Sequence, residues 1–309
     1  MLTRVEAVRQ MAARPRLHDY TEPGIVVDGC IVPPSPRLAP IVAGLARNAF
    51  VGDVVARQCM YRMPEPVPWL LVVNGARGAR VLACGPRTRI EVDCLPPWTT
   101  SMSAALLHPG ALGPLLGLPA ALVADACIDI EDVLGERGRA LREALEACRS
   151  ADEQLVVLEH GLLDLARAAA LPATPVSVEV ARVLTRAPMR QRELERVSGW
   201  SERQLRRRFD HDLGLSPKRF LRLLRFNRVI DLLRAPRRRP WSELAATLGY
   251  SDQAHLIHEF RAFTGASPTA FLADPVSAQA LRHGAVPRPR LRAVARATRG
   301  PATGPSVPA

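Results

Sequence analysis

The sequence predicts an α+β N-terminal domain followed by an all-α C-terminal domain that contains two helix-turn-helix units. Three observations support this fold class. The length of 309 residues suits two domains of roughly 150 residues each. Short apolar runs between turn-forming residues fill the first half, as is typical of strands, and capped helical segments recur in the second half. We therefore place the domains at residues 1–172 and 173–275, with a tail at residues 276–309.

Four apolar runs in the first half are expected to be strands. They are bounded by Pro, Gly and polar residues, including the turn-forming pair Asn74-Gly75. The expected strands are residues 25–27, 70–73, 81–83 and 102–107.

Helical patterns follow in the second part of this half. Residues 112–116 predict one short helical turn, and residues 135–150 predict a longer helix. Residues 153–170 have apolar side chains three and four positions apart, which is the spacing of an amphipathic helix. Residues 171–175 include two prolines and are expected to link the domains. The tail after residue 275 has five prolines and no acidic residue, so we expect it to be largely disordered.

Net positive charge is confined to the C-terminal part of the chain. Residues 1–175 have 17 Arg against 19 Asp and Glu, whereas residues 176–275 have 19 Lys and Arg against 11 acids. The tail adds six Arg, so the net charge of +12 arises entirely after residue 175. This asymmetry favours a polyanionic partner, and nucleic acid is the usual one. An Arg-rich genome explains Arg in place of Lys, but not the near-neutral first half.

The chain shows no secretion or membrane signal. Its start, MLTRVEAVRQ, lacks the apolar core of a signal peptide. The most apolar stretch, residues 104–123, contains three prolines and three glycines, which argues against a membrane helix. We expect a soluble cytoplasmic protein with no membrane partner.

All six cysteines lie in the first half, and none forms a CxxC pair. Neither they nor the seven histidines show zinc-ligand spacing there, so we expect no metal site, and no cofactor motif is present. In a cytosolic protein we expect reduced, buried cysteines, with a thiol sensor as the minor alternative. Cys84 is interpreted as a small residue that ends a strand, because no base is visible beside it. The cysteines are Cys30, Cys59, Cys84, Cys94, Cys127 and Cys148.

An internal repeat dominates the second half. The pattern Phe209-x4-Gly-x-Ser-Pro-x2-Phe220 recurs with identical spacing as Phe260-x4-Gly-x-Ser-Pro-x2-Phe271. Upstream, Gly-Trp-Ser at residues 199–201 is echoed by Gly-Tyr-Ser at residues 249–251. Each copy therefore reads as helix, tight turn and capped helix, which is the plan of a helix-turn-helix unit.

The repeated residue types are those that begin and end helices. We expect Ser201 and Ser251 to be N-caps, and Gly199 and Gly249 to adopt the positive φ of a tight turn. Later in each copy a glycine C-cap precedes a serine N-cap with proline at the first helical position. These residues are Gly214, Ser216 and Pro217 in the first copy, and Gly265, Ser267 and Pro268 in the second.

The second helix of the first unit carries four arginines within six residues. If Leu205 and Phe209 face the core, a period of 3.6 residues turns Arg203 and Arg207 outward. The flanking positions are Arg206, Arg208 and Gln204. A charged helix face is usually only solvated, but a capped helix after a glycine turn, present twice, favours DNA binding. Arginine is suited to bidentate contact with guanine.

The second unit has a less basic face. With Leu256 and Phe260 inward, Ala254 and His258 face outward. Gln253 and Ile257 lie beside them. Glutamine can read adenine, and the two apolar side chains can contact a thymine methyl group.

The repeated pattern of the second half resembles a known family. The segment GYSDQAHLIHEFRAFTGASPTAF, residues 249–271, is similar to the signature of AraC/XylS-type transcriptional regulators, and the resemblance covers about residues 178–272. It implies seven helices, with a long helix at about residues 217–233 between two units that enter successive major-groove segments. By position it implies base contacts from Glu202, Arg203, Arg206 and Arg207, and from Gln253, Ala254, Ile257 and His258.

The full set of expected DNA contacts adds helix starts and phosphate-binding positions. It comprises Ser201, Glu202, Arg203, Gln204, Arg206, Arg207, Arg208, Lys218, Arg219, Ser251, Gln253, Ala254, His255, Ile257 and His258.

Two residues depart from the family pattern. Glu195 stands where a small Ala usually packs, and we expect it at a partly exposed edge. His258 stands where the second helix usually has Arg, which predicts weaker binding by the second unit. The cluster at residues 237–239 lies either near a phosphate or in a solvated loop.

The first half resembles the N-terminal domain of an uncharacterised subgroup of these regulators. The match rests on CGPRTR at residues 84–89, HPGALGPLLGLP at 108–119 and IEDVLG at 130–135. It implies a sensor-like regulatory or dimerisation domain. The expected partners are promoter DNA, RNA polymerase if the protein activates, a small-molecule effector at the N-terminal domain, and a second copy of the chain.

Two other functions stay open at this stage. One is a DNA-linked alkyl-transfer repair protein with a reactive cysteine in the first half, although we expect no enzyme. The other is non-specific nucleic-acid binding by the basic tail.

Overall fold

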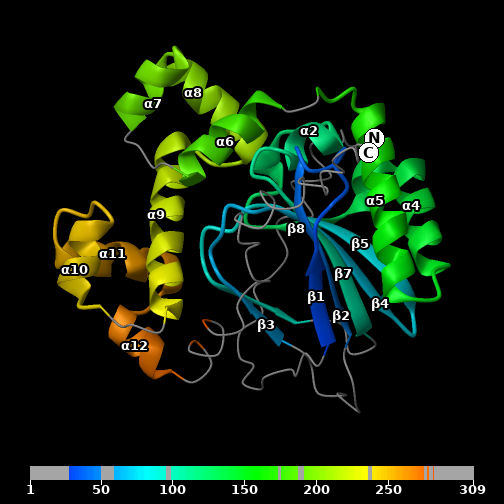
Figure 1. The fold of residues 1–309 in the computed structure, drawn as a ribbon, viewed down its shortest axis with the longest axis horizontal. Helices are drawn as coiled ribbons and strands as arrows, with labels where there is room; N and C mark the ends of the chain where they lie inside the picture. Colours follow the sequence, from blue (N-terminus) through cyan, green and yellow to red (C-terminus); the bar gives the residue numbers. More distant parts are fainter. Residues whose placement is uncertain are drawn as a thin grey trace, which may run out of the picture.

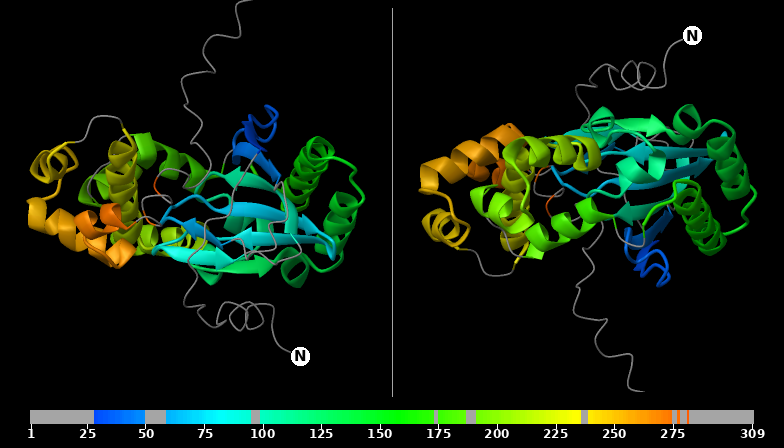
Figure 2. Two further views of the ribbon diagram at one scale, coloured as in Figure 1. Left: turned by 90° about the horizontal axis from the view of Figure 1, so that it is seen from below. Right: turned by 90° about the horizontal axis from the view of Figure 1, so that it is seen from above.

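A computed structural model describes residues 28–49, 59–94, 99–172, 175–186, 191–235 and 239–274, together with Ser277 and Leu281. The N-terminal part is an antiparallel sheet with helices against it, and the C-terminal part is helical (Figure 1). Helices α4 (Glu136–Glu146) and α5 (Ala151–Ala168) lie on the side of the sheet away from the C-terminal part (Figure 2). The predicted fold class is confirmed.

Six strands of the described residues form the main sheet, in the order β1-β2-β7-β4-β5-β8, and every neighbouring pair is antiparallel. A second sheet pairs β3 with β6. The main strands are β1 (Asp28–Val32), β2 (Val42–Ala49), β7 (Thr99–Leu107), β4 (Trp69–Gly75), β5 (Gly78–Cys84) and β8 (Cys127–Asp129). The smaller sheet comprises β3 (Cys59–Arg62) and β6 (Glu91–Cys94).

The predicted strands within β4, β5 and β7 are confirmed, and each observed strand is longer than expected. The predicted strand at residues 25–27 lies outside the described residues. The expected turn is displaced, because Asn74 and Gly75 still pair with β5. The chain turns at Ala76 and Arg77, and Gly78 closes the turn with a φ of 90°.

The main sheet is buried on both faces, as the central strand β4 shows. Leu70 and Val72 pack with α2 (Leu112–Leu116) and α5 in the larger core. Leu71 and Val73 point to the other face and join a smaller apolar cluster. Burial on both faces explains why β4 reads as a continuous apolar run and does not alternate.

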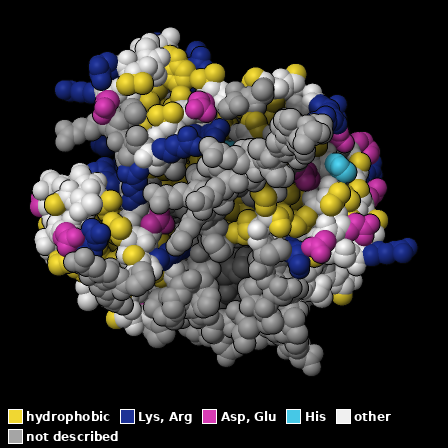
Figure 3. All heavy atoms as spheres, viewed as in Figure 1, with side chains coloured by type: hydrophobic (Ala, Val, Ile, Leu, Met, Phe, Trp, Pro, Cys, Tyr) yellow, Lys and Arg dark blue, Asp and Glu magenta, His cyan; other side chains and the backbone are white. Residues whose placement is uncertain are grey.

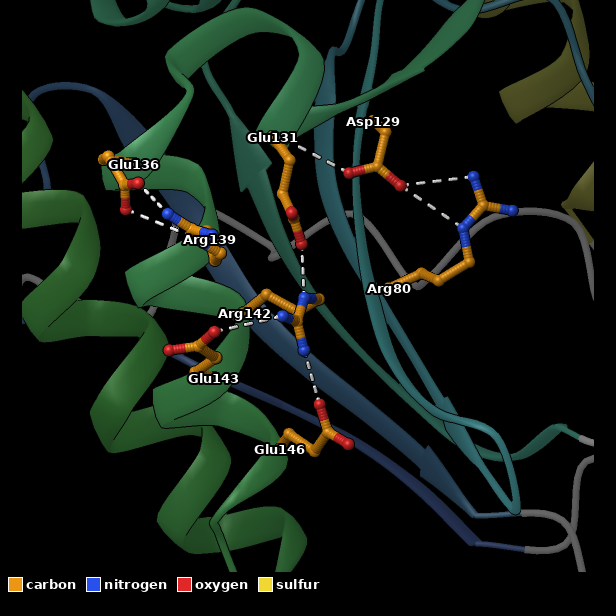
Figure 4. A network of polar contacts seen from close by, with 8 residues as sticks. All are labelled: Arg80, Asp129, Glu131, Glu136, Arg139, Arg142, Glu143 and Glu146. Carbon is orange, nitrogen blue, oxygen red and sulfur yellow. Dashed lines mark hydrogen bonds and ion pairs between the residues drawn. The ribbon is translucent and has the colours of Figure 1, made fainter.

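Charged side chains fasten the helices after β8 to the sheet edge (Figure 4). Asp129 at the end of β8 accepts from Arg80 of β5 at 3.2 Å and caps α3 (Ile130–Leu134) through the amide of Glu131. Arg142 of α4 pairs with the carboxylate of Glu131. The helices predicted at α2, α4 and α5 are confirmed.

The C-terminal part contains seven α-helices among the described residues. They are α6 (Val176–Arg186), α7 (Gln191–Ser198), α8 (Glu202–Arg208), α9 (Pro217–Arg234), α10 (Trp241–Thr247), α11 (Gln253–Thr264) and α12 (Pro268–Ala273). The long central helix α9 is confirmed. Phe226 of α9 contacts Phe260 and Phe263 of α11, with ring centroids 5.5 and 4.7 Å away. A π-helical segment, Phe209–Leu213, continues α8 and was not predicted.

Most predicted helix ends are confirmed. Ser201, Ser216 and Ser267 each accept a hydrogen bond from an amide in the first turn of the following helix. The predicted glycines all have positive φ, between 68° and 78°. They are Gly199, Gly214, Gly249 and Gly265.

The prediction for Ser251 is wrong. The N-cap of α11 is Asp252, whose carboxylate accepts from the His255 amide at 2.7 Å. The hydroxyl of Ser251 instead donates to this carboxylate at 3.0 Å. Asp and Ser are about equally good caps, so the following residue takes the role here.

The two parts of the chain are docked against each other. Met63 of the N-terminal part is buried in the core of the helical part. The carbonyl of Pro64 accepts from Nδ2 of Asn227 at 2.9 Å, in a buried contact. The Ile90 amide donates to the carbonyl of Phe263 at 3.0 Å.

A disulfide joins Cys84 and Cys127, so the reduced state expected for the cysteines is wrong for this pair. The two residues are 43 positions apart but are paired directly across β5 and β8. Cys148 is a free, half-buried thiol. The other three cysteine side chains lie outside the described residues.

Two residues of the predicted disordered tail are described. Leu281 is buried against the helical core, and its carbonyl accepts from Arg234 Nε at 2.8 Å, so the chain is ordered at this position. The rest of the tail and residues 237 and 238 of the arginine cluster fall outside the described residues. No described helix is both long and apolar enough to span a membrane.

Candidate nucleic-acid interface

Helix α8 presents its charged face to solvent. Ser201 caps the helix, and Oε1 of Gln204 accepts from the Ser201 amide at 2.9 Å, which completes a capping box. Leu205 is fully buried beneath the helix. Arg203 and Arg207 are exposed, so the helix has the orientation that its periodicity predicts.

The other two arginines of α8 have neighbours within their own unit. Arg208 lies over the Trp200 ring, 4.5 Å from its centroid. Arg206 Nε is 3.8 Å from the Asp210 carboxylate, in an exposed pair that is worth little. Within the part of the chain that is described, Arg203 and Arg207 have no ion pair or ring contact.

Helix α11 presents the corresponding face of the second unit with fewer charges. Its inward residues Leu256 and Phe260 are buried. The outward residues Gln253, Ala254 and His258 are exposed, and Ile257 is half-buried.

The other predicted contacts on this unit, Ser251 and His255, hold the start of α11. Nδ1 of His255 is 3.1 Å from the Ser251 hydroxyl, and its Nε2 is 3.9 Å from the Glu259 carboxylate. The hydrogen bond from the His255 amide, followed by that from Ser251, lowers the pKa of Asp252. The cap is therefore a carboxylate at the positive end of the helix.

A groove of about 880 Å³ lies between the two units. One face of α9 lines it with Lys218, Arg222, Arg225 and Arg228, which follow one another at three- and four-residue intervals. Basic side chains gather between the lobe that contains α7 and α8 and the lobe that contains α10 and α11 (Figure 3). The three arginines are not among the residues predicted to contact DNA, although their helical spacing was a signal that could have found them.

The groove arginines also brace the units on α9. Nε of Arg222 is 2.5 Å from Oε1 of Glu259, whose side chain is only 5% exposed. Burial, and then the negative charge of Glu259, raise the pKa of Tyr250 well above its usual value. Arg225 donates to the carbonyl of Gly249 at 3.2 Å, in the turn of the second unit.

The two predicted DNA contacts in the first turn of α9 point to different surroundings. Lys218 is exposed and lines the groove. Arg219 instead contacts the N-terminal domain, where its guanidinium donates to the Thr88 hydroxyl and lies 3.6 Å from the Asp125 carboxylate. This carboxylate also accepts from the Thr88 amide and hydroxyl at 2.5 Å each. Arg219 therefore fastens the two domains together.

Glu195, which departs from the family pattern, is half-buried, as expected. Its carboxylate accepts from Nε2 of Gln191 one helical turn earlier, at 3.1 Å. The larger side chain is therefore accommodated at the surface of α7.

Chemistry of other kinds has little support in the described residues. No group of three or more His, Cys, Asp or Glu is arranged to hold a metal there. Cys84 is fully buried and bonded to Cys127, so it does not offer the free thiolate that an alkyl-transfer enzyme needs.

Comparison with known proteins identifies the helical part. A family model described as a helix-turn-helix domain matches residues 194–274, which run from within α7 to just past the end of α12. The helical part is a helix-turn-helix domain of the AraC type. The chain thus carries the DNA-binding domain of a transcription regulator.

Two solved structures of ToxT from Vibrio cholerae are similar to the chain, at 8% and 7% identity and a TM-score of 0.37 each. The alignments cover 70% of this chain and 94% and 93% of theirs. A likeness at this level supports no conclusion about function. No curated protein matches the chain.

Proposed function

We propose that this AraC-type domain reads one promoter with two recognition helices, α8 and α11, in successive major-groove segments. The two exposed helix faces carry the proposal, because each belongs to a helix that follows a glycine turn and buries a leucine on its other side. Arg203 and Arg207 suit guanine, and Gln253 suits adenine. His258 lacks the permanent charge of arginine, so α8 supplies more of the affinity than α11.

The basic groove along α9 supports a path for the DNA backbone between the two segments. Lys218 is the groove cation best exposed to a phosphate. The proposed contact set keeps the predicted residues that face solvent or the groove: Ser201, Glu202, Arg203, Gln204, Arg206, Arg207, Arg208, Lys218, Gln253, Ala254, Ile257 and His258. Ser251, Arg219 and His255 act through the position of the helices.

The remaining partners follow from a regulatory role. Residues 1–172 are proposed as a regulatory or dimerisation domain that takes a small-molecule effector or a second copy of the chain. RNA polymerase is the further partner if the protein activates. Such a regulator acts in the cytoplasm, where promoter DNA lies.

Footprinting tests the assignment of α8. Genome-wide mapping of bound sites first identifies a promoter. At the protein concentration that just protects the promoter with the wild type, Arg203→Ala with Arg207→Ala is expected to abolish the footprint, because the two outward guanidinium groups are removed. The control, Arg192→Ala with Arg196→Ala, removes the same charge from exposed positions of α7 and should keep the footprint. Protection of the same promoter by the α8 variant would show that the recognition helix is misassigned.

A further inference from the structure

The disulfide between Cys84 and Cys127 lies beside two arginines, Arg87 and Arg62, which also pair with the carboxylates of Glu91 and Glu65. Cys84 is fully buried and shares an apolar cluster with Trp69, whereas Cys127 is half-buried. Arg87 Nη2 donates to Cys127 Sγ at 3.2 Å, and Arg62 Nη1 does so at 3.7 Å. Guanidinium groups stabilise a thiolate. The sulfur of Cys127 is therefore placed where it can carry negative charge when the disulfide opens.

The same two arginines belong to the segments that hold the AraC-type domain. Arg62 directly precedes Met63, which is buried in the core of that domain. Arg87 is 2% exposed and directly precedes Thr88, whose hydroxyl accepts from Arg219 of α9. The sulfur site and the domain interface therefore share two short pieces of backbone.

We propose that Cys84 and Cys127 form a thiol–disulfide exchange site for dithiols and glutathione-class thiols, and that the state of this pair sets how firmly the N-terminal domain holds the AraC-type domain. In cytosolic proteins, disulfides are usually transient and serve redox sensing or catalysis. This exchange site is a further function beside promoter recognition. Its thiol chemistry does not depend on whether the protein binds DNA.

The reduction transfers two electrons from a dithiol to the protein; of the dithiol's two protons, one goes to Cys84 and the other is released to solvent. One thiolate of the dithiol attacks Cys127, the more accessible sulfur, and forms a mixed disulfide while Cys84 leaves and takes a proton. The second thiolate then attacks the dithiol's own sulfur in the mixed disulfide. The dithiol closes to a cyclic disulfide, and Cys127 departs as a thiolate beside Arg87 and Arg62. Oxidation by glutathione disulfide reverses the change and releases two glutathione thiols.

Reduction breaks the S–S bond, and the two sulfur atoms must then move apart to van der Waals distance. Cys84 is enclosed in the sheet, so Cys127 is the side that moves. Cys127 is two residues from Asp125, which holds the amide and hydroxyl of Thr88 and lies 3.6 Å from Arg219. Reduction therefore loosens the contact between the domains.

Thiol mapping of the full chain tests the exchange site. After equilibration in buffers of graded glutathione to glutathione disulfide ratio, alkylation and mass spectrometry should show a reversible change between the Cys84–Cys127 linkage and two thiols. Arg87→Gln, or Arg62→Gln if that variant folds better, should slow reduction by dithiothreitol about tenfold through loss of one cation. Arg167→Gln, which removes an exposed arginine of α5 that pairs with Asp164, should not change the rate.

Hydrogen exchange of the wild-type protein tests the coupling. The Thr88 amide donates to Asp125, and the Ile90 amide donates to the carbonyl of Phe263 in the other domain. Both amides should exchange with solvent at least about fivefold faster after reduction. The Val72 amide in the centre of β4 is the control. Absence of the Cys84–Cys127 linkage from oxidised protein, or equal exchange in both states, would overturn the proposal. Neither readout involves DNA, so failure here is distinct from failure of promoter recognition.

Discussion

At the scale of single residues, the two recognition helices begin in chemically different ways. Helix α8 starts at the neutral hydroxyl of Ser201 inside a capping box, and α11 starts at the carboxylate of Asp252. Both satisfy a free amide of the first turn, but only the second carries a charge that acid removes. The N-cap of α11 is therefore sensitive to acid, and that of α8 is not.

Thermal unfolding as a function of pH should reveal this difference. Hydrogen bonds lower the pKa of Asp252 in the folded protein, so the carboxylate adds stability above its unfolded pKa of about 4. That stability is lost as the pH falls through the lower, folded pKa. Between about pH 4 and pH 2, the Tm of the wild type should fall more steeply than that of Asp252→Asn, which caps without charge. Parallel curves would contradict the assigned cap.

Matched serine substitutions test the caps at neutral pH. Ser201→Ala removes an N-cap acceptor and should lower the free energy of unfolding by about 1 kcal/mol in urea titrations. Ser251→Ala removes no cap and should change it by less than about 0.5 kcal/mol. Equal losses would mean that Ser251, and not Asp252, begins α11.

Local sequence therefore predicted the helix faces better than the helix starts. Ser251 and Asp252 are adjacent and both good caps, so the sequence alone leaves the choice between them open. The inward positions Leu256 and Phe260 depend on the helical period and do not change with a cap one residue later.

At the scale of elements, α9 is the part that holds the two units in one arrangement. Its inner face packs Phe226 against Phe260 and Phe263 of α11. On its groove face, Arg222 pairs with Glu259 and Arg225 with the carbonyl of Gly249, both in the second unit. The spacing of the two recognition helices thus depends on polar contacts as well as on the core.

Removal of one brace should be costly. Arg222→Ala leaves the buried carboxylate of Glu259 without its cation and should destabilise the domain by about 2 kcal/mol. The value lies below the usual range for a buried pair, because a third of the Arg222 side chain is exposed. Lys218→Ala, at an exposed site on the same face, should change the urea midpoint little. A similar midpoint for both variants would argue against the brace.

Helices were easier to predict than sheet topology, since caps, glycines and the 3.6-residue period act within a few residues. The π-helical segment Phe209–Leu213 was missed because its residues continue the apolar pattern of α8. The order of the strands in the sheet arises from contacts between distant residues, which single-strand patterns do not contain. The turn after β4 was displaced for a related reason, because pairing extends through Asn74 and Gly75.

At the scale of the whole molecule, the first helix-turn-helix unit serves also as a docking surface. Gly214 and Gly265 occupy the same position in the two copies of the repeat and have similar φ values of 74° and 78°. A Cβ on Gly214 would lie 2.6 Å from the carbonyl oxygen of Ala120 in the N-terminal domain, whereas one on Gly265 would meet nothing within 4 Å. Only the first glycine therefore serves both the turn and the interface.

The two glycines form a matched test of docking. Gly265→Ala should cost about 1 kcal/mol, the penalty for a side chain at positive φ. Gly214→Ala has the same penalty, and its Cβ also clashes with the backbone of Ala120. The free energy of unfolding should therefore fall by more than about 2 kcal/mol. This substitution should also speed limited proteolysis between the domains. Equal unfolding free energies for the two variants would remove the docking role of Gly214.

Contacts at this scale were beyond prediction from sequence. The contact between Thr88 and Arg219 joins residues 131 positions apart, and the disulfide joins residues 43 apart. Nothing in either local pattern indicates the other partner. For the same reason Arg219 was assigned to DNA on its charge and position, and its second role became visible only with the fold.

Selection of binding sites from random duplex DNA tests the central claim most directly. The full chain should enrich a motif with two halves centred about one helical turn, roughly 10 base pairs, apart. Arg203→Ala with Arg207→Ala should erase one half only, and Gln253→Ala with His258→Ala should erase the other. Enrichment of no motif, or loss of the same half in both variants, would contradict reading by two helices.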